Sequence, residues 1–301
     1  MIRRPPRSTP SNSSAASDVY KRQVGQERLI AMGNIDLISK YHIDEVEKRV
    51  RELRKNWKDR VIISSLMGTD KEVWQTVTKR LIDAGADIIE CSFSCPQGSM
   101  GEEPGKMLAQ SPPATEMVTG WVKEAAGSVP VFIKITPQVT DIVEIARRVK
   151  NGGADGITAS NTIPALMGID LETLQPIPSV KGYSTYSGLS GPAIKPISLK
   201  VISEIAKNVD ILISGTGGCG NWRDAVEFMA VGAGTVQMGT APMRYGFRII
   251  DDLISGLYHY LEKKGFESPS DIVGKTLPYI CLLYTSDAAD ELDGVDLGGR
   301  R

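Results

Sequence analysis

A lysine stands in one of the most β-branched runs of the chain, Val131-Phe132-Ile133-Lys134-Ile135. A lysine in such a run must point into the interior of the fold or lie at its mouth, and a buried cation needs an anionic partner. We interpret Lys134 as a cation that faces the electron-rich edge of a redox cofactor, where it stabilises the negative charge that develops on reduction. The alternative is an edge lysine whose ammonium group reaches solvent.

Two glycine clusters stand where later strands should end. Ser214-Gly215-Thr216-Gly217-Gly218 leaves one strand and leads into a helix near Asn221, and Met238-Gly239-Thr240-Ala241 ends the next strand. Glycine lets the backbone approach a ligand closely, and a helix N-terminus offers unpaired N–H groups to an anion. In β/α barrels the loops after the last two strands are the usual phosphate site. The clusters therefore predict a cofactor or substrate that carries phosphate.

The stretch Cys91-Ser92-Phe93-Ser94-Cys95-Pro96 carries two cysteines with different expected roles. Cys91 lies within a strand and is interpreted as a small core residue. Cys95 falls where this strand gives way to a long loop, and a thiol with an ordinary pKa of ~8.5 can give or take a proton near neutral pH. No cluster of histidine or further cysteine completes a metal site around the pair, so we expect no metal.

Another strand candidate ends in Ala159-Ser160-Asn161-Thr162. The Asn161 side chain offers both a donor and an acceptor, which suits the amide edge of a heterocycle. The alternative is a turn or a cap, a common role of asparagine at the end of a strand. The chain has only two histidines, His42 and His259, so it offers neither a Ser/His/Asp triad nor a histidine-based metal site.

Composition narrows the class of protein. The chain has 301 residues, 41% of them hydrophobic and 24% charged, which fits one large α/β domain or two small ones. A formal net charge of −1 argues against nucleic acid or an acidic membrane surface as the main partner. No run approaches the ~20 apolar residues that cross a bilayer, and the four scattered cysteines are too few for a disulfide framework. We therefore expect a cytoplasmic protein.

Short β-branched runs alternate with amphipathic stretches along most of the chain. The strand candidates are 61–66, 87–91, 131–135, 156–159, 211–214 and 235–238, and the helix candidates include 71–83, 114–126, 140–150, 196–207 and 221–231. Alternating strands and helices predict a parallel sheet, and strands that are mostly apolar predict a sheet that is covered on both faces.

The links between these elements differ in length. Helices pass to the next strand through short links of small residues at 83–87, 151–155 and 230–234, whereas two links from strand to helix are long, 95–112 and 161–195. In a β/α barrel the loops at the C-terminal ends of the strands build the active site. A doubly wound sheet also binds ligands there, but no Gly-x-Gly-x-x-Gly follows the first strand. We therefore predict an α/β protein with a TIM (β/α)8-type barrel.

Both ends of the chain break from this pattern. Residues 1–23 are rich in Arg, Pro and Ser without an apolar period, and residues 281–301 depart abruptly from the pattern before them. We expect both segments to be foreign or disordered tails that add nothing to a core. The barrel then occupies residues 24–280, and we expect it to be incomplete at its N-terminus because about six of eight barrel strands are recognisable.

Several motifs occur in an order that resembles a known family. They are Asn34–Ser39, Ser94–Pro96, Ile133–Pro137, Ser160–Thr162, Gly188–Ile194 and Gly215–Gly218. Together they resemble the FMN-binding barrel of the dihydropyrimidine dehydrogenases, in particular the bacterial NAD-dependent catalytic subunits. The resemblance to dihydroorotate dehydrogenases is more distant. It covers roughly residues 25–280 and is specific because many ordered motifs agree.

The resemblance implies a flavoprotein whose site residues divide into three groups. Lys134 would face the N1/O2 edge of FMN, and Cys95 would protonate pyrimidine C5 while flavin N5 delivers hydride to C6. Backbone near five positions would hold the phosphate: Gly191, Gly217, Gly218, Gly239 and Thr240. Four side chains would hydrogen-bond the substrate ring: Asn34, Ser94, Asn161 and Thr162. A fifth substrate position, Ser92, stands where the family usually has Asn, so that contact is expected to be shortened or lost.

The same resemblance implies reduction of the 5,6-double bond of uracil or thymine. Electrons would come from NAD(P)H through a partner subunit in a homo- or hetero-oligomer, and iron–sulfur clusters would belong only to a further C-terminal region or to the partner. The family also often has His at Gln97 and Asn at Gln138. Two alternatives stay open: a dihydroorotate dehydrogenase, and a non-redox phosphate-binding aldolase or synthase in which Lys134 forms a Schiff base.

Overall fold

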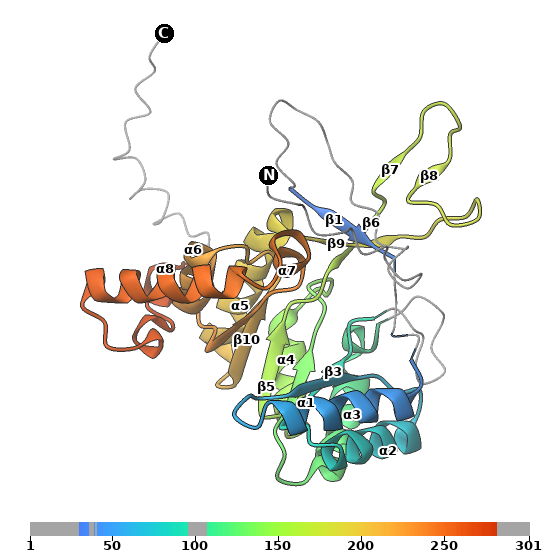
Figure 1. Ribbon diagram of the computed structural model, residues 1–301, viewed down its shortest axis with the longest axis horizontal. Coiled ribbons are helices and arrows are strands. Elements are labelled where there is room, and N and C mark those ends of the chain that lie inside the picture. The colour runs from blue at the N-terminus through green and yellow to red at the C-terminus, as the bar shows by residue number, and fades with distance from the viewer. Residues whose placement is uncertain (1–29, 36–38, 40, 96–106, 282–301) are drawn as a thin grey trace, which may run out of the picture.

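The computed structural model describes residues 30–35, 39, 41–95 and 107–281, and in them six parallel strands form a curled sheet. The strands are β2 (Ile63–Leu66), β3 (Ile88–Ser92), β4 (Val131–Lys134), β5 (Gly156–Ala159), β10 (Leu212–Thr216) and β11 (Thr235–Gln237). They lie side by side in chain order, and within the described residues β2 and β11 pair on one side only. The sheet is an open arc, or half-barrel (Figure 1), which confirms the predicted barrel-type fold and its six strands.

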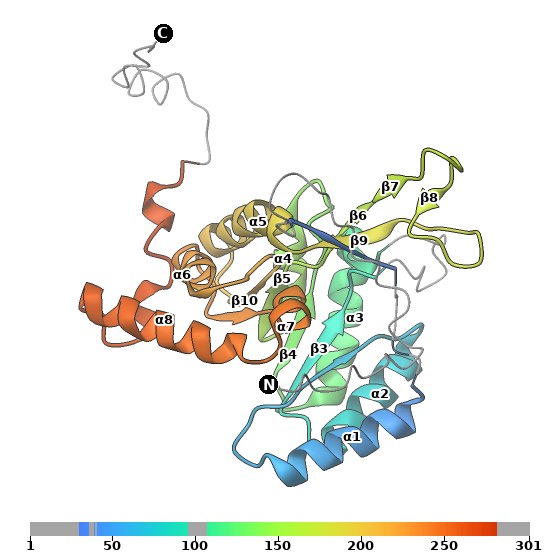
Figure 2. The same ribbon diagram turned by 45° about the horizontal axis from the view of Figure 1, so that its top comes forward.

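Eight α-helices accompany the sheet in the described part of the chain. They are α1 (Ile43–Asn56), α2 (Lys71–Asp83), α3 (Pro112–Ala126), α4 (Ile142–Asn151), α5 (Lys195–Asn208), α6 (Trp222–Ala230), α7 (Thr240–Tyr245) and α8 (Ile249–Lys264). Neighbouring helices pack in sequence from α1 to α6 around the outside of the arc, and α6 packs against α8 (Figure 2). Five of the helices, α2 to α6, match the predicted stretches closely.

A repeated aspartate fixes the start of two strands. Asp87 accepts a hydrogen bond from the backbone N–H of Ile62 at 2.7 Å, and Asp155 accepts one from Val131 at 2.8 Å. The bond from Ile62 lowers the pKa of Asp87, with a further contribution from Arg54. Each aspartate therefore ties the entry of its own strand to the entry of the neighbouring strand, which sets the parallel register that follows.

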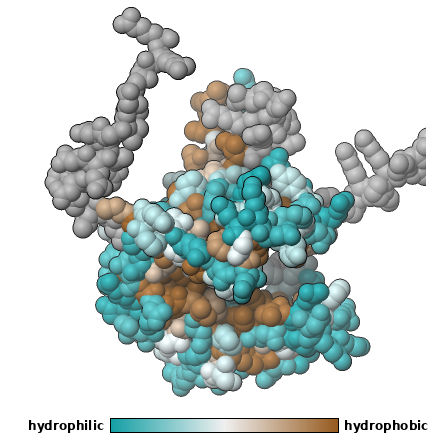
Figure 3. All heavy atoms as spheres, turned by 90° about the vertical axis from the view of Figure 1, so that its left-hand side faces the viewer, coloured by the Kyte–Doolittle hydropathy of each residue, from teal (hydrophilic) through white to brown (hydrophobic). Residues whose placement is uncertain are grey.

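Side chains alternate between the two faces of the arc. In β4, Val131 and Ile133 are fully buried, whereas Phe132 and Lys134 are only partly buried. Ile133 belongs to the core between the sheet and the helices, together with Trp74 and Phe93, whose rings meet edge to face at 5.4 Å. Because side chains on a strand alternate with a period of two, Phe132 and Lys134 lie on the concave face. Seen from the side of α8, apolar surface gathers in a hollow across the molecule (Figure 3).

A small antiparallel sheet lies next to the C-terminal ends of the barrel strands. It is formed by β1 (Met32–Asn34), β9 (Ser187–Ser190) and β6 (Ile163–Ala165), in the order β1-β9-β6. A hairpin of β7 (Gly168–Ile169) and β8 (Pro176–Ile177) extends beside it (Figure 1). The predicted long link 161–195 therefore contains its own strands, and their pairing with β1 brings a distant N-terminal segment to the barrel mouth.

The two predicted tails fall almost entirely outside the described residues, apart from the exposed Cys281. No helix among the described residues is long and apolar enough to span a membrane.

Candidate active site

A cavity of about 620 Å³ opens at the C-terminal ends of the strands. Its volume lies in the range of ~300–1,000 Å³ that is usual for cofactor and small-molecule sites. Nine of the twelve predicted site residues line it: Asn34, Lys134, Asn161, Thr162, Gly191, Gly217, Gly218, Gly239 and Thr240. They come from six separate segments of the chain, so the fold brings the predicted phosphate loops, the lysine and three of the substrate residues to one place.

The glycines at one end of the cavity leave room for a ligand. Gly191, Gly217 and Gly218 have φ values of +91°, +111° and +97°, in the left-handed region that favours glycine. A Cβ at Gly218 would lie 2.8 Å from the backbone N of Lys195 and 2.9 Å from the carbonyl O of Gly191. Within the described residues, the N–H groups of Gly217 and Gly218 make no hydrogen bond. Successive free amides of this kind form an anion-binding concavity.

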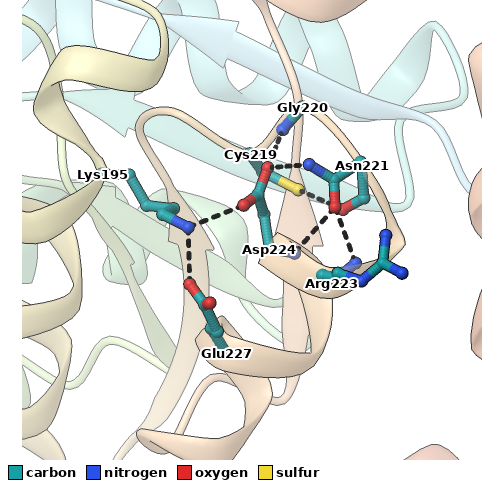
Figure 4. Close-up of polar contacts among 7 residues, drawn as sticks. All are labelled: Lys195, Cys219, Gly220, Asn221, Arg223, Asp224 and Glu227. Carbon is teal, nitrogen blue, oxygen red and sulfur yellow. Dashed lines mark hydrogen bonds and ion pairs between the residues drawn. The ribbon is translucent and has the colours of Figure 1, made fainter. Parts of the chain in front are cut away.

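The N-terminus of α6 has a different role from the one that the sequence suggested. Asn221 caps this helix, and its side-chain oxygen accepts hydrogen bonds from the N–H groups of Arg223 at 2.9 Å and Asp224 at 3.3 Å (Figure 4). The N–H groups of Arg223 and Asp224 are therefore not available to bind an anion. The loop amides at Gly217 and Gly218 are the groups that can bind an anion here, rather than the start of the helix.

Lys195 links two helices at the end of the cavity that contains Gly217 and Gly218. Its Nζ lies 2.7 Å from Asp224 and 2.6 Å from Glu227, so it joins the start of α5 to α6 (Figure 4). Burial opposes the charge of the ammonium group, but the hydrogen bonds to the two carboxylates more than offset this, and the pKa of Lys195 is raised. Burial, together with the nearby Asp224, also raises the pKa of the Cys219 thiol to about 12. The sequence carries no local signal for this cluster, because Lys195 and its partners Asp224 and Glu227 are about 30 residues apart in the chain.

Lys134 lies at another part of the cavity wall, and one acidic side chain among the described residues lies within ion-pair distance of it. Its Nζ is 3.9 Å from Oε1 of Glu90, which stands on the adjacent strand β3. The expected anionic partner is therefore present. Glu90 is a site residue that was not predicted from the sequence, although an acid between Ile89 and Cys91 in an apolar strand is a usable signal.

Glu90 belongs to a polar network on the concave face. Its Oε2 accepts hydrogen bonds from the Thr158 hydroxyl and from the Gln237 amide, each at 2.8 Å. Gln237 also donates to the Ser214 hydroxyl at 3.1 Å. The network thus links strands β3, β5, β10 and β11, and it holds a carboxylate whose side chain is only 8% exposed.

The three remaining predicted residues, Ser92, Ser94 and Cys95, lie outside the cavity lining but beside Lys134. Ser92 is the register partner of Lys134, and its hydroxyl is 3.1 Å from the sulfur of Cys95. Asn161, which lines the cavity, donates from its side chain to the carbonyl of Ser94 at 3.2 Å. Within the described residues the buried Ser94 hydroxyl has no hydrogen-bond partner.

The cysteine within β3, Cys91, and the cysteine that follows the strand, Cys95, differ in their surroundings. Cys95 is partly exposed. Residues 96–106 of the predicted long link 95–112 lie outside the described residues, and the rest of the link contains a short 3₁₀ helix, Leu108–Gln110, and the start of α3. Cys91 is fully buried, and burial raises the pKa of its thiol far above the ordinary range. Cys91 thus has the buried core position that the sequence predicted.

The substrate candidates Asn34 and Thr162 meet around Gly188. Asn34 is the register partner of Gly188 in the small antiparallel sheet. A Cβ at Gly188 would clash with the Thr162 hydroxyl and would lie 3.0 Å from the Thr162 Cβ. Glycine at this position therefore lets β9 lie directly against Thr162. The sheet therefore decides that both side chains lie at the cavity.

These features fit the FMN expected from the sequence. Free loop amides suit its phosphate, and a cation suits the ring edge that gains negative charge on reduction. The buried Ser94 hydroxyl lacks a partner among the described residues, and the carbonyl of the same residue accepts a hydrogen bond from Asn161, which lines the cavity. No group of three or more His, Cys, Asp or Glu in the described residues is placed to hold a metal ion.

Comparison with known proteins gives consistent matches. The sequence profile of the family described as dihydroorotate dehydrogenase matches residues 26–261. The NAD-dependent dihydropyrimidine dehydrogenase subunit PreA of Escherichia coli (strain K12) is 40% identical over 248 residues, which are 81% of this chain and 60% of that protein. The chloroplastic dihydropyrimidine dehydrogenase (NADP(+)) of Arabidopsis thaliana is 36% identical over 278 residues, 90% of this chain and 63% of the relative.

A third relative carries a different substrate in its name. The catalytic subunit of dihydroorotate dehydrogenase B (NAD(+)) of Pyrococcus horikoshii is 38% identical over 217 residues, which are 72% of this chain and 68% of that protein. The chain therefore spans about 60% of the length of the bacterial dihydropyrimidine dehydrogenase subunit and about two thirds of this relative.

Proposed function

The chain belongs to the dihydroorotate dehydrogenase family, and from this premise we propose that it is an FMN-dependent oxidoreductase that reduces the 5,6-double bond of uracil or thymine. Its electrons come from NAD(P)H through a partner subunit, and it acts in the cytoplasm. The name of the Escherichia coli relative, a subunit of an NAD-dependent dihydropyrimidine dehydrogenase, supports both the substrate class and the partner.

One observation carries the proposal. A single cavity is lined both by the free amides of the Gly217–Gly218 loop and by the ammonium group of Lys134. An anion site together with a cation on the strand wall suits a cofactor that has a phosphate at one end and a redox ring at the other. A non-redox barrel in which Lys134 forms a Schiff base would use the same two features, and uptake of FMN separates the two functions.

The chain's own residues divide the work around this cavity. The backbone near Gly191, Gly217, Gly218, Gly239 and Thr240 binds the phosphate, and Lys134 stabilises negative charge at the ring edge. FMN, when bound, supplies the hydride step. The protein supplies orientation and a proton, and five side chains hold the pyrimidine ring: Asn34, Ser92, Ser94, Asn161 and Thr162.

Cys95 is the proposed proton donor. Its thiol lies 3.1 Å from the Ser92 hydroxyl, and Ser92 is the strand neighbour of Lys134. In the reducing direction Cys95 gives its proton to C5 of the pyrimidine, and the hydroxyl of Ser92 can stabilise the thiolate that is left.

Dihydroorotate oxidation is the second candidate. The Pyrococcus horikoshii relative supports it with a similar identity over a shorter part of this chain. We place it second because the match to the Escherichia coli dihydropyrimidine dehydrogenase subunit covers 81% of the chain rather than 72%.

The test is anaerobic titration of the purified protein after reconstitution with FMN. We expect a visible flavin band that dihydrouracil or dihydrothymine bleaches and dihydroorotate does not. Bleaching by dihydroorotate alone would exchange the first candidate for the second. A protein that takes up no FMN would contradict both and favour a non-redox barrel.

A further inference from the structure

Glu90 is a buried carboxylate for which the reaction proposed above has no use. We infer that Glu90 is the fixed counter-charge of Lys134: it positions the ammonium group in the cavity and sets how much of its positive charge acts on the bound cofactor. This inference rests on the proposed function, because it concerns the edge of the flavin that Lys134 faces. Glu90 is a positioning residue, since it acts through Lys134.

The two oxygens of the carboxylate have different surroundings. Oε2 accepts the hydrogen bonds from Thr158 and Gln237, both at 2.8 Å. Oε1 is the oxygen nearest to Lys134, at 3.9 Å from Nζ. Two donors, one on the central strand β5 and one on the edge strand β11, therefore hold the carboxylate in place and leave its other oxygen for the lysine. A residue that only filled space would not need this division.

The separation of 3.9 Å also has a consequence for charge. It is an ion pair without the close contact that Lys195 makes with its two carboxylates, so the charge of Lys134 is balanced in part rather than fully. In a partly buried site a charge at this distance acts strongly on its neighbours. Removing the negative charge of Glu90 should therefore leave a more positive environment at the ring edge.

The direct test is Glu90→Gln in the FMN-loaded protein. Glutamine keeps the shape and can still accept from Thr158 and Gln237, but it has no charge to offer Lys134. We expect the midpoint potential of the flavin to shift to more positive values, because the reduced flavin carries more negative charge and is stabilised. Glu116→Gln is the matched control: it removes a surface ion pair with Arg148, outside the cavity lining, and should leave the potential unchanged.

A double-mutant cycle shows whether the effect passes through Lys134. In a Lys134→Met background, the shift caused by Glu90→Gln should be smaller than in the wild-type background. An equal shift in both backgrounds, no shift, or a shift to more negative potential would overturn the inference while leaving the proposed function in place.

Thr158→Val provides a second variant if Glu90→Gln does not fold. It is isosteric and suits a strand, and it removes one donor from Glu90 while the carboxylate keeps its charge. More of that charge then acts on Lys134, so the potential should shift to more negative values, opposite to Glu90→Gln. A shift in the positive direction, or none, would contradict the counter-charge role.

Failure of the proposed function gives a different pattern. If the wild-type protein takes up no FMN, the proposed function is wrong. The same four proteins of the double-mutant cycle are then compared by the urea concentration at the midpoint of unfolding, without cofactor. Glu90→Gln should lower the unfolding midpoint less in the Lys134→Met background than in the wild-type background. Equal effects in both would overturn the pairing as well.

Discussion

Two regions of the molecule each place a lysine in the cavity lining and a cysteine near that lysine, but the two pairs are in different states: Lys195 with Cys219, which also lines the cavity, and Lys134 with Cys95, which lies outside the lining. Lys134 and Lys195 have similarly small exposed fractions, 23% and 25% of the side chain. Within the part of the chain that the structure describes, Lys195 contacts two carboxylates closely, whereas Lys134 has one carboxylate at 3.9 Å. Likewise Cys219 is buried beside Asp224, whereas Cys95 is partly exposed next to a hydroxyl.

This difference separates a lysine that holds the structure together from one that can act on a ligand. Lys195, at the start of α5, forms close ion pairs with Asp224 and Glu227 of α6. These ion pairs neutralise its charge and stabilise the loop that contains Gly217 and Gly218. The charge of Lys134 is only partly balanced, so it can act on whatever binds in the cavity. Burial and residue type are the same, and the number and distance of the acidic partners decide the role.

The comparison of the cysteines predicts the largest effect. Cys95→Ala should lower the rate of pyrimidine reduction by roughly 10²–10⁴-fold, because the proton donor is lost. Flavin binding should be unchanged, as measured by the visible spectrum. Cys219→Ala should have a far smaller effect on the rate. Similar rates for Cys95→Ala and the wild type would remove Cys95 from the mechanism.

The lysines should differ in the kind of damage their loss causes. Lys134→Met should lower turnover by about 10²-fold, as loss of one charge-stabilising group commonly does, and shift the flavin potential to more negative values. Lys195→Met should instead destabilise the protein by about 2–4 kcal/mol, because it leaves Asp224 and Glu227 without their cation. Turnover and urea unfolding are measured for both variants. If Lys195→Met leaves stability intact, the distinction fails.

The phosphate loop should be sensitive to a single methyl group. Gly218→Ala places a Cβ about 2.8 Å from the backbone N of Lys195, at a φ of +97°. We expect a loss of roughly 1–3 kcal/mol of stability from the strained backbone and weaker FMN binding in a fluorescence titration. Gly120→Ala is the control: its Cβ meets nothing within 4 Å in the middle of α3, so it should stabilise the helix by about 0.5–1 kcal/mol.

The comparison with the smallest consequence for the protein concerns the reactivity of the two thiols toward an alkylating reagent. It is measured in a Cys281→Ser variant, because Cys281 is exposed and would otherwise react as well. At pH 8 a thiol with a pKa of about 12 is ionised to roughly one part in 10⁴, so Cys219 should react with an alkylating reagent far more slowly than Cys95. Equal labelling of the two thiols, mapped by mass spectrometry, would contradict the comparison.

The same pKa has a consequence for stability. The pKa of Cys219 in the folded protein lies above its ordinary value of 9.0, so its contribution to stability is fully present below pH 9 and is lost as the pH rises toward about 12. Cys219→Ala should therefore flatten the loss of stability in this alkaline range, as measured by unfolding at several pH values.

Much of the fold followed from local sequence. The β-branched runs and the short small-residue links predicted the six strands, and the amphipathic stretches predicted α2 to α6. Strands β1, β6 and β9 were not predicted, because each contains glycine or proline and lacks a β-branched run, and each exists through pairing with segments elsewhere in the chain. Local pattern carries little information about strands of this kind.

The site was predictable where glycine, a lysine or a small polar residue stands at the end of an apolar strand, and nine of the twelve predicted residues do meet in one cavity. The network around Glu90 was not, since its partners Thr158 and Gln237 are 68 and 147 residues away along the chain.

The sequence alone thus determined the order of strands and helices and the presence of a lysine at the end of a strand, because backbone conformation and side-chain alternation are local properties. Only the tertiary structure decided that Lys195 is neutralised by two close carboxylates, whereas the charge of Lys134 is only partly balanced and can act on a bound ligand. Pairing of charges depends on distance in space, and the carboxylates that meet Lys195 and Lys134 come from other elements of the fold.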